Sequence, residues 1–209
     1  MYEYLKKAIV NGDLKVGEIY SEQMFADQLD ISRTPVREAV LQLKHENMLE
    51  VYNNRGIMVK PLLFEDVQMI IQTRIAIEGY SIRHLTQRIQ TPEAQAVLQK
   101  MEACLVHEAD IQAKGADVYE FMKSDVEFHG LGIGFMRNDY FSKTIDMLRS
   151  RLEKATVGSL KLKNRTAMTL AEHEQIIEHI RTGDAEAAYI AFEHHMDVTE
   201  KIMKHCRLD

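Results

Sequence analysis

The sequence predicts a mainly α-helical protein in which a winged helix-turn-helix precedes an all-α six-helix bundle. Three observations predict this fold class. A helix, turn and helix pattern occupies residues 21–44, two short strand patterns follow it, and long helical periods with almost no strand signal run from residue 66 onwards. We expect residues 1–61 to form the first domain, residues 62–65 a linker and residues 66–209 the second domain.

The second helix of the helix-turn-helix begins in the run Ser32–Val40. Ser32 is placed to cap this helix, and Pro35 is tolerated in the first turn, where no intrahelical amide bond is lost. The apolar residues of the run share the buried face, so Arg33 and Arg37 remain outside, four residues apart. Arginines presented in this way can donate paired hydrogen bonds to guanine in the DNA major groove. The run therefore predicts a recognition helix.

Two short strands are predicted after this helix, at Leu49–Tyr52 and Ile57–Lys60. The residues between them, Asn53-Asn54-Arg55-Gly56, supply the polar and glycine chemistry of a hairpin turn. A two-stranded hairpin following a helix-turn-helix is typical of a DNA-contacting wing.

Residues 5 to 61 strongly resemble the DNA-binding domain of GntR-family bacterial transcription regulators. The resemblance rests on the run SRTPVREA and on the wing that contains a glycine. It implies a homodimer on a palindromic operator in double-stranded DNA, with recognition helices about 34 Å apart. Arg33 and Arg37 would contact bases, Thr34 a phosphate, and Arg55 with Gly56 the region of the minor groove.

The net charge argues for local rather than general attraction to DNA. The chain has 26 basic and 32 acidic side chains, and residues 1–61 hold eight basic against nine acidic ones. Nucleic-acid-binding domains usually carry a basic surface. We therefore expect specific binding with few phosphate contacts and weak affinity for random DNA.

Composition places the chain among globular proteins, with 209 residues of which 45% are hydrophobic and 28% charged. No apolar run approaches the roughly 18 residues of a membrane span, and no basic-then-apolar leader opens the chain. A cytoplasmic protein is expected, with no membrane partner. Cys104 and Cys206 lack a CxxC partner and are expected to be reduced and structural or incidental.

The second domain is predicted as six long helices with a boundary near Pro61. Thr91 is the expected N-cap and Gly115 the expected stop of the second of these helices. The predicted ranges are residues 65–89, 92–114, 118–136, 140–160, 169–181 and 185–205.

Four polar residues interrupt the apolar faces of these helices: Asp125, His129, His173 and His195. Asp125 and His129 are one turn apart on one helix, and the two other histidines come from separate helices. A lone histidine in such a place is more often a hydrogen-bonded core residue than a ligand. Four together favour a divalent metal ion, with zinc expected first and nickel, manganese or iron possible alternatives for this mixed donor set.

Residues 66 to 209 are similar to the FCD effector domain of FadR-type GntR regulators, and specifically to the shorter VanR-like group. Metal-binding members carry an Asp-x3-His, a Glu-His pair and a late histidine after Gly-Asp. This chain shows Asp125 with His129, Glu172 with His173, and His195 after Gly183-Asp184. The resemblance implies that a small carboxylic acid binds as effector, often completing the metal shell.

Arg74 and Glu78 interrupt the apolar face of the first bundle helix. A buried arginine there either pairs with Glu78 or reaches into a cavity to hold an anion, and the sequence leaves both open. The family resemblance favours an effector-facing Arg74 and places Asn138 near the pocket. Gly130-Leu131-Gly132-Ile133-Gly134 favours a loosened helix end beside the cavity, while a phosphate-cradling loop lacks the strand and Lys-Ser/Thr it needs.

The sequence thus predicts a ligand-responsive repressor and not an enzyme. One alternative is a regulator that senses the metal itself. A metal-dependent hydrolase is remote, since there is no HExxH-like signature and the N-terminal motif would be unexplained. A regulator that binds an acyl thioester without metal is disfavoured by the four inward ligands.

Overall fold

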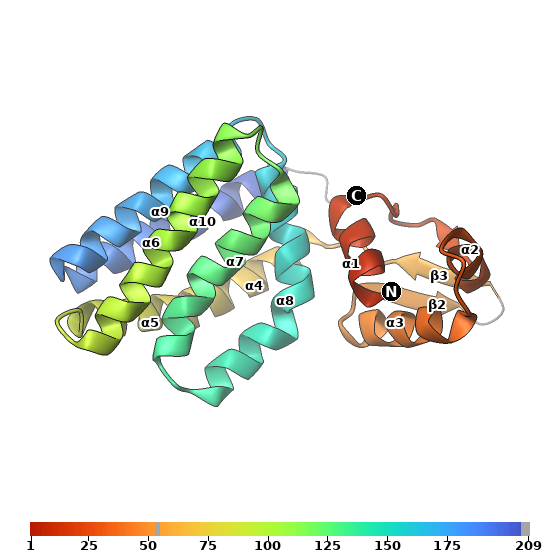
Figure 1. Ribbon diagram of the computed structural model, residues 1–209, viewed down its shortest axis with the longest axis horizontal. Helices are drawn as coiled ribbons and strands as arrows, with labels where there is room; N and C mark the ends of the chain where they lie inside the picture. The colour runs from red at the N-terminus through yellow and green to blue at the C-terminus, as the bar shows by residue number, and fades with distance from the viewer. Residues whose placement is uncertain (53–54, 206–209) are drawn as a thin grey trace.

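The computed structural model describes residues 1–52 and 55–205, which form two lobes (Figure 1). Asn53 and Asn54 of the predicted turn, and Cys206, lie outside the described residues. Within these described ranges, the N-terminal lobe contains three helices and a small sheet, and the elements of the second lobe are all helices. The predicted fold class is confirmed.

The helix-turn-helix consists of α2 (Glu22–Gln28) and α3 (Arg33–His45), with α1 (Tyr2–Asn11) packed against α3. The Ser21 hydroxyl accepts a hydrogen bond from the Met24 backbone N–H at 3.0 Å, so it caps α2. Ser32 occupies the N-cap position of α3, although its side chain makes no capping hydrogen bond.

The wing is the outer part of a three-stranded antiparallel sheet in the order β1-β3-β2. Its strands are β1 (Ile19–Tyr20), β2 (Leu49–Tyr52) and β3 (Gly56–Val59). Strand β3 begins one residue earlier than predicted. Strand β1 was not predicted, because two residues are too few to show the alternation of apolar and polar side chains that marks a strand. Gly56 has φ +126°, and a Cβ atom there would lie 2.3 Å from the Tyr20 carbonyl oxygen. Only glycine fits where β3 passes this close to β1.

As far as residue 205, the helical lobe contains seven α-helices, because the first predicted helix is interrupted by the five-residue π-helical turn η1 (Ile75–Gly79). Thr91 caps α6 as predicted, through a hydrogen bond from the Ala94 N–H. The helices are α4 (Phe64–Arg74), α5 (Tyr80–Gln87), α6 (Pro92–Ala113), α7 (Val118–Phe135), α8 (Asp139–Leu160), α9 (Arg165–Thr182) and α10 (Ala185–His205).

Two sequence expectations about these helices are wrong. Helix α9 begins at Arg165, four residues before its predicted start, directly after Asn164 in a left-handed conformation. Helix α7 is not loosened at its glycines but continues through Gly130, Gly132 and Gly134 to Phe135. Packing against the neighbouring helices therefore outweighs the low helix propensity of glycine there.

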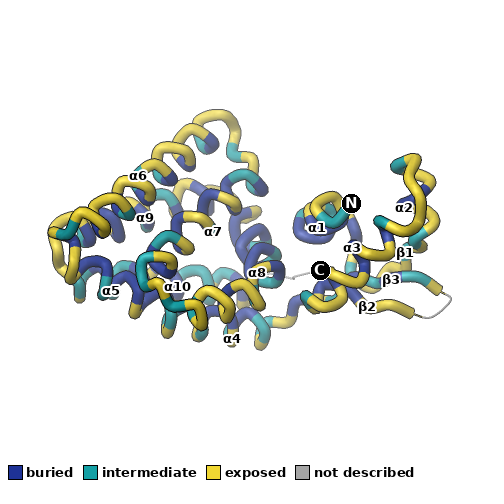
Figure 2. The backbone as a smooth tube through the Cα atoms, turned by 60° about the horizontal axis from the view of Figure 1, so that its bottom comes forward, coloured by how far each residue is buried: buried dark blue, intermediate teal, exposed yellow. Residues whose placement is uncertain are grey.

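The buried positions of the bundle lie on the inward faces of its helices (Figure 2). A second apolar cluster joins the lobes, since Leu5 and Ile9 of α1 belong to the same core as Val157 and Leu160 of α8. Helix α8 thus belongs to the bundle and also supports the helix-turn-helix. No helix in the described part of the chain has both the length and the apolar character needed to span a membrane.

Candidate metal centre and DNA-contacting surface

The four predicted metal ligands meet in the middle of the helical lobe. Asp125 and His129 come from α7, His173 from α9 and His195 from α10. Each offers one ligand atom, and these four atoms all lie within 4.8 Å of one another. All four residues are buried, with at most 6% of their surface exposed.

A glutamate side chain lies next to Nδ1 of each of the three imidazoles. His173 Nδ1 lies 2.9 Å from Glu108 Oε2, and His195 Nδ1 lies 2.6 Å from Glu172 Oε2. His129 Nδ1 lies 3.1 Å from Glu78 Oε2, with the ring not aligned for a hydrogen bond. Carboxylates in this position fix the tautomer of a metal-binding histidine and make its other nitrogen a better donor. The arrangement leaves Nε2 as the ligand atom of His173 and His195, and Nε2 of His129 if Glu78 orients that ring in the same way.

The Nε2 atoms of His129 and His173 are buried without a hydrogen-bond partner among the described residues. The nearest acidic atom to His173 Nε2 is Asp125 Oδ1, at 3.6 Å. Unpaired buried nitrogens cost free energy unless something compensates them. One divalent ion at the shared centre would satisfy them together, so these residues fit a metal.

Electrostatics favour neutral imidazoles at His129 and His195, as metal binding requires. Burial, helped by the Arg74 charge, lowers the pKa of His129 well below its usual value, and burial likewise lowers the pKa of His195. Burial would raise the pKa of Glu172, but hydrogen bonds from His195 and Arg165 lower it to about 2. Burial raises the pKa of Asp125 to about 6.

The roles of Glu108 and Arg165 were not predicted from the sequence. Glu108 on α6 is completely buried, and Arg165 at the start of α9 donates to Glu172 Oε1 at 2.7 Å. A carboxylate at an inward position of the predicted α6 could have identified Glu108. Arg165 gave no such signal, because it preceded the predicted start of its helix.

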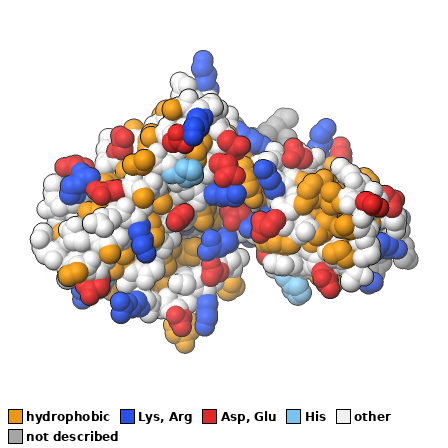
Figure 3. All heavy atoms as spheres, viewed as in Figure 1, with side chains coloured by type: hydrophobic (Ala, Val, Ile, Leu, Met, Phe, Trp, Pro, Cys, Tyr) orange, Lys and Arg blue, Asp and Glu red, His pale blue; other side chains and the backbone are white. Residues whose placement is uncertain are grey.

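The predicted DNA contacts occupy a separate surface of the N-terminal lobe. Arg33, Thr34 and Arg37 are exposed in the first turns of α3, and Arg55 is exposed beside Gly56 at the start of β3. Arg33 is 3.6 Å from Glu22, but its side chain is 64% exposed, so this pair is weak. Basic and acidic side chains are mixed over the face shown in Figure 3.

Comparison with known families matches both lobes. The FCD domain matches residues 69–198, and the family of bacterial regulatory proteins called gntR matches residues 1–59. The chain belongs to the GntR family of bacterial transcription regulators, with an FCD effector domain. It is a DNA-binding regulator and not an enzyme, because the family and its relatives are transcription regulators.

Curated relatives of the regulator cover most of both chains. An uncharacterized HTH-type transcriptional regulator, YdhC of Bacillus subtilis, is 25% identical over 90% of this chain and 82% of its own. The gluconate operon transcriptional repressor of the same organism is 26% identical over 86% of this chain and 74% of its own. The transcriptional repressor RspR of Escherichia coli is 23% identical over 97% and 87%.

Solved structures show the same fold. A GntR transcriptional regulator from Rhodococcus sp. RHA1 has a TM-score of 0.80 at 20% identity, covering 98% of this chain and 96% of its own. Escherichia coli McbR/YncC has a TM-score of 0.77 at 21% identity, with coverage of 97% and 94%.

In this regulator a small space adjoins the candidate metal centre. The inner cavity, of about 170 Å³, is bounded by the following residues of the α4–η1 segment, α7 and α8. They are Arg74, Glu78, Val126, His129, Gly130, Ile133, Gly134, Ser142, Ile145, Asp146, Arg149 and Leu152.

The sequence left open whether Arg74 pairs with Glu78 or reaches into a cavity. Its guanidinium donates to both oxygens of Glu78, at 2.7 and 3.0 Å, so the two residues form a buried ion pair. The same side chains line the inner cavity, so the pairing does not remove Arg74 from it. The π-helical turn places Glu78 between Arg74 and His129.

Asn138 has a structural role. Its side-chain oxygen accepts a hydrogen bond from the Tyr140 N–H at 3.0 Å and caps α8. It is absent from the described walls of the inner cavity. The resemblance that placed it near the pocket therefore gains no support from its position.

Proposed function

We propose that the regulator represses transcription as a homodimer on a palindromic operator, and that a small carboxylic acid bound at a divalent metal releases it. One observation carries the proposal. Three imidazoles, each backed by a glutamate, and one aspartate converge from three helices on a single centre next to a cavity. Such a set has no evident use in a protein that only binds DNA.

Asp125, His129, His173 and His195 would hold the metal, with zinc expected first and nickel, manganese or iron as alternatives. When bound, the ion would supply a Lewis-acidic position for a carboxylate oxygen. Glu108 and Glu172 would keep the imidazoles oriented.

The inner cavity offers cationic and hydroxyl groups suited to an acid. Arg74 and Arg149 line it together with Ser142, while Ile133 and Ile145 supply apolar walls. Each arginine lies beside a carboxylate that also lines the cavity, Arg74 beside Glu78 and Arg149 beside Asp146, and an acid would share these donors. Arginine pairs well with a carboxylate because its donors match the two oxygens. The gluconate operon repressor among the relatives carries an acid in its name, which favours acidic effectors here too.

A direct path joins the effector side to the DNA-binding lobe. Glu153 and Arg149 of α8 line the same groove on the surface of the helical lobe. Glu153 Oε2 also lies 2.7 Å from Nζ of Lys6 in α1. Glu46, at the end of α3, accepts from Ser150 of α8. An acid that moves α8 would therefore move α1 and α3. It shifts the equilibrium only if it binds the two arrangements of the lobes with different affinity.

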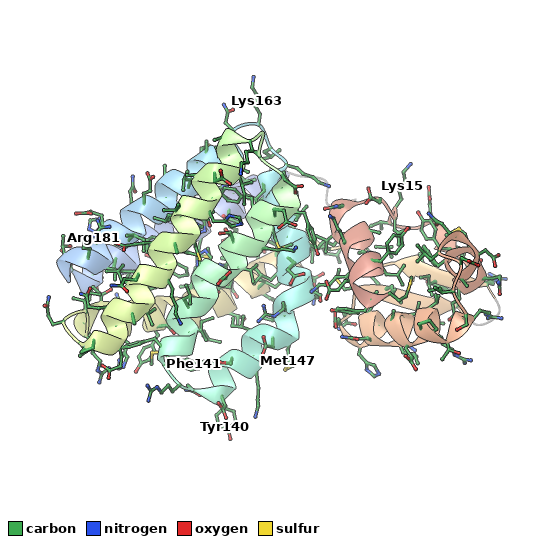
Figure 4. The ribbon with its side chains drawn as sticks, in the orientation of Figure 1. Lys15, Tyr140, Phe141, Met147, Lys163 and Arg181 are labelled. Carbon is green, nitrogen blue, oxygen red and sulfur yellow. The ribbon has the colours of Figure 1, made fainter. Side chains whose placement is uncertain are left out.

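An apolar surface at the N-terminal end of α8 supports a homodimer. Tyr80 and the Phe141 ring meet edge to face, and Tyr140 and Met147 are about 80% exposed. These α8 residues extend outward from the helical lobe (Figure 4). Exposed apolar side chains gathered in this way mark interaction surfaces.

We further propose that residues 1–61 are the DNA-binding domain, residues 62–65 the linker and residues 66–209 the effector and dimerisation domain, acting in the cytoplasm. Arg33 and Arg37 would contact bases, Thr34 a phosphate, and Arg55 with Gly56 the wing side of the site.

Metal analysis of purified protein tests the metal part of the proposal. We expect about one zinc per chain after reconstitution, and much less in the His173→Ala variant. A second candidate function is supported by the completeness of the ligand set, namely that the ion itself is the signal. A pure metal sensor would change its operator affinity with metal alone and ignore every acid.

A further inference from the structure

Helix α7 contains three glycines whose presence the backbone does not require. Each costs up to about 1 kcal/mol relative to alanine in a helix interior. None of the three has a positive φ, so their conformation is open to any residue. Their use must lie in the space that a missing side chain leaves.

The three glycines differ in what they face. A Cβ atom at Gly130 or Gly134 would meet nothing within 4 Å, whereas one at Gly132 would lie 4.0 Å from Ser81 Cβ of α5. Gly130 and Gly134 are one helical turn apart and share a face of α7. That face is open, and the face of Gly132 is packed.

Gly130 and Gly134 line the inner cavity and also a larger space, the outer groove, of about 1020 Å³. The two spaces have Val126 and Arg149 in common as well. They therefore adjoin along the open face of α7. The outer groove lies among α5, α6, α7 and α8.

Its walls are formed by His84, Arg88, Thr91, Glu93, Ala96, Val97, Lys100, Met122, Lys123, Val126, Glu127, Gly130, Leu131, Gly134, Phe135, Arg137, Arg149 and Glu153.

The outer groove has five Lys or Arg residues against three Glu, which are Glu93, Glu127 and Glu153. Lys123 and Arg149 are paired with carboxylates on their own helices, and Glu153 is paired with Lys6. Among the described residues, Arg88 contacts the His84 ring, and no carboxylate pairs with Arg88, Lys100 or Arg137, while Glu93 and Glu127 also have no cationic partner. Three cations are thus available to an anionic group, next to apolar side chains such as Val97 and Phe135.

The inner end of this space has its own unpaired group. His129 lines the inner cavity, is only 6% exposed, and has no hydrogen-bond partner for either ring nitrogen among the described residues. Because His129 is also a candidate metal ligand, an acid at the inner end would lie beside the metal centre, while the cations favour a second anionic group at the outer end.

We propose that the inner cavity and the outer groove together bind one elongated acid with an anionic group at each end. One carboxylate lies in the inner cavity beside the metal centre, and the chain of the ligand passes over Gly130 and Gly134. The second anionic group pairs with Arg88, Lys100 or Arg137. This inference rests on the proposed function, because it assumes an acid at the metal centre, and it names the class of that acid.

Calorimetric titration of the zinc-loaded full-length protein tests the proposal. The probes are unbranched dicarboxylates from malonate to pimelate, each compared with the monocarboxylate of equal chain length. Affinity should rise with length and reach at least tenfold above the matched monocarboxylate. Substitution of Arg88, Lys100 and Arg137 by Gln together should remove that advantage and leave monocarboxylate binding unchanged.

The glycines provide a matched set of variants. Gly130→Ala and Gly134→Ala should raise the melting temperature of the ligand-free protein while weakening the longest bound dicarboxylate at least tenfold. Gly132→Ala lies in the same helix but outside both cavities, and should leave dicarboxylate binding unchanged.

The outcomes distinguish a failure of the proposed function from a failure of this inference alone. If no acid of any length binds the zinc-loaded protein, the proposed function fails and this inference fails with it. If acids bind, but without preference for length or for a second charge, and Gly130→Ala binds them as the wild type does, the inference alone is overturned.

Discussion

Lys6 of α1 and Glu153 of α8 form an ion pair between the two lobes, with Nζ and Oε2 2.7 Å apart and side chains only 8% and 11% exposed. Glu153 also borders the outer groove. One side chain thus contacts both the proposed effector space and the DNA-binding lobe. Under the proposed function, this pair is one route by which an effector could influence operator binding.

Replacing Glu153 by Gln should weaken both stability and signalling. It leaves the Lys6 ammonium buried without its partner, a change that costs roughly 3 to 5 kcal/mol in fully buried pairs. Chemical denaturation measures the loss. Asp110→Asn is a suitable control, because it removes the exposed Lys114 pair and should cost well under about 1 kcal/mol.

The double variant Lys6→Met with Glu153→Leu separates stability from signalling. It removes both charges and should fold about as stably as the wild type. We expect it to bind the operator but to respond less to acid. An unchanged response would show that the signal takes another route.

Arg37→Ala should weaken binding to the specific operator by about 1 to 3 kcal/mol and relax preference at one base position. Fluorescence anisotropy with operator and scrambled DNA measures both. Arg181→Ala, on the surface of α9, removes an exposed arginine from the other lobe and serves as control. An equal loss for operator and scrambled DNA would place Arg37 on the backbone instead.

Much of this arrangement was predictable from local sequence. The apolar positions of α3 left Arg33 and Arg37 exposed at its start, and the spacing of Asp125 and His129 placed both on one face of α7. Periodicity determines these faces, and it requires no knowledge of distant residues.

Other parts depended on contacts that local sequence does not encode. Glu108 reaches His173 across 65 positions of the chain, so its role appears only when α6 and α9 are packed together. The π-helical turn η1 lies inside an ordinary helical pattern. The glycines of α7 suggested a helix end, but α7 packs against α6 and α8, and the helix continues through its glycines.

Glu108→Gln should lower metal affinity about 10- to 100-fold, because it removes the charge that makes His173 a strong donor. Competition with a chromogenic chelator measures the affinity. Glu102→Gln lies on the same helix but on the surface, paired with Arg181, and should leave the affinity unchanged. Equal affinities for both variants would remove Glu108 from the metal site.

Chelation should destabilise the folded protein. A ligand present at about 100 times its dissociation constant stabilises the native state by about 2.7 kcal/mol, which is lost when it is removed. The melting temperature of wild type should fall on addition of EDTA. His194→Gln, an exposed neighbour of the ligand His195, should behave as wild type, whereas His195→Gln should show little response to EDTA.

Lys154 should give the lobe interface a distinct pH dependence. Its ammonium donates to the Lys60 carbonyl oxygen at 3.0 Å, and burial lowers its pKa from 10.5 to about 8. Between these values the unfolded chain binds more protons than the folded one, so the free energy of unfolding should rise with pH.

Denaturation of wild type and Lys154→Met from pH 7 to 10.5 measures this contribution. The stability difference should shift in favour of the wild type above about pH 8. The exposed Lys163→Met variant is the control. A difference that stays constant across the range would exclude a buried Lys154 charge.

Operator affinity measured against acid, with and without metal, tests the central claim most directly. Gluconate and the dicarboxylate series are titrated into the operator complex of the zinc-loaded protein, the metal-free protein and the His173→Ala variant. We predict at least tenfold weaker operator binding with an acid in the zinc-loaded wild type alone. The same response in the metal-free protein and in the His173→Ala variant would contradict the account.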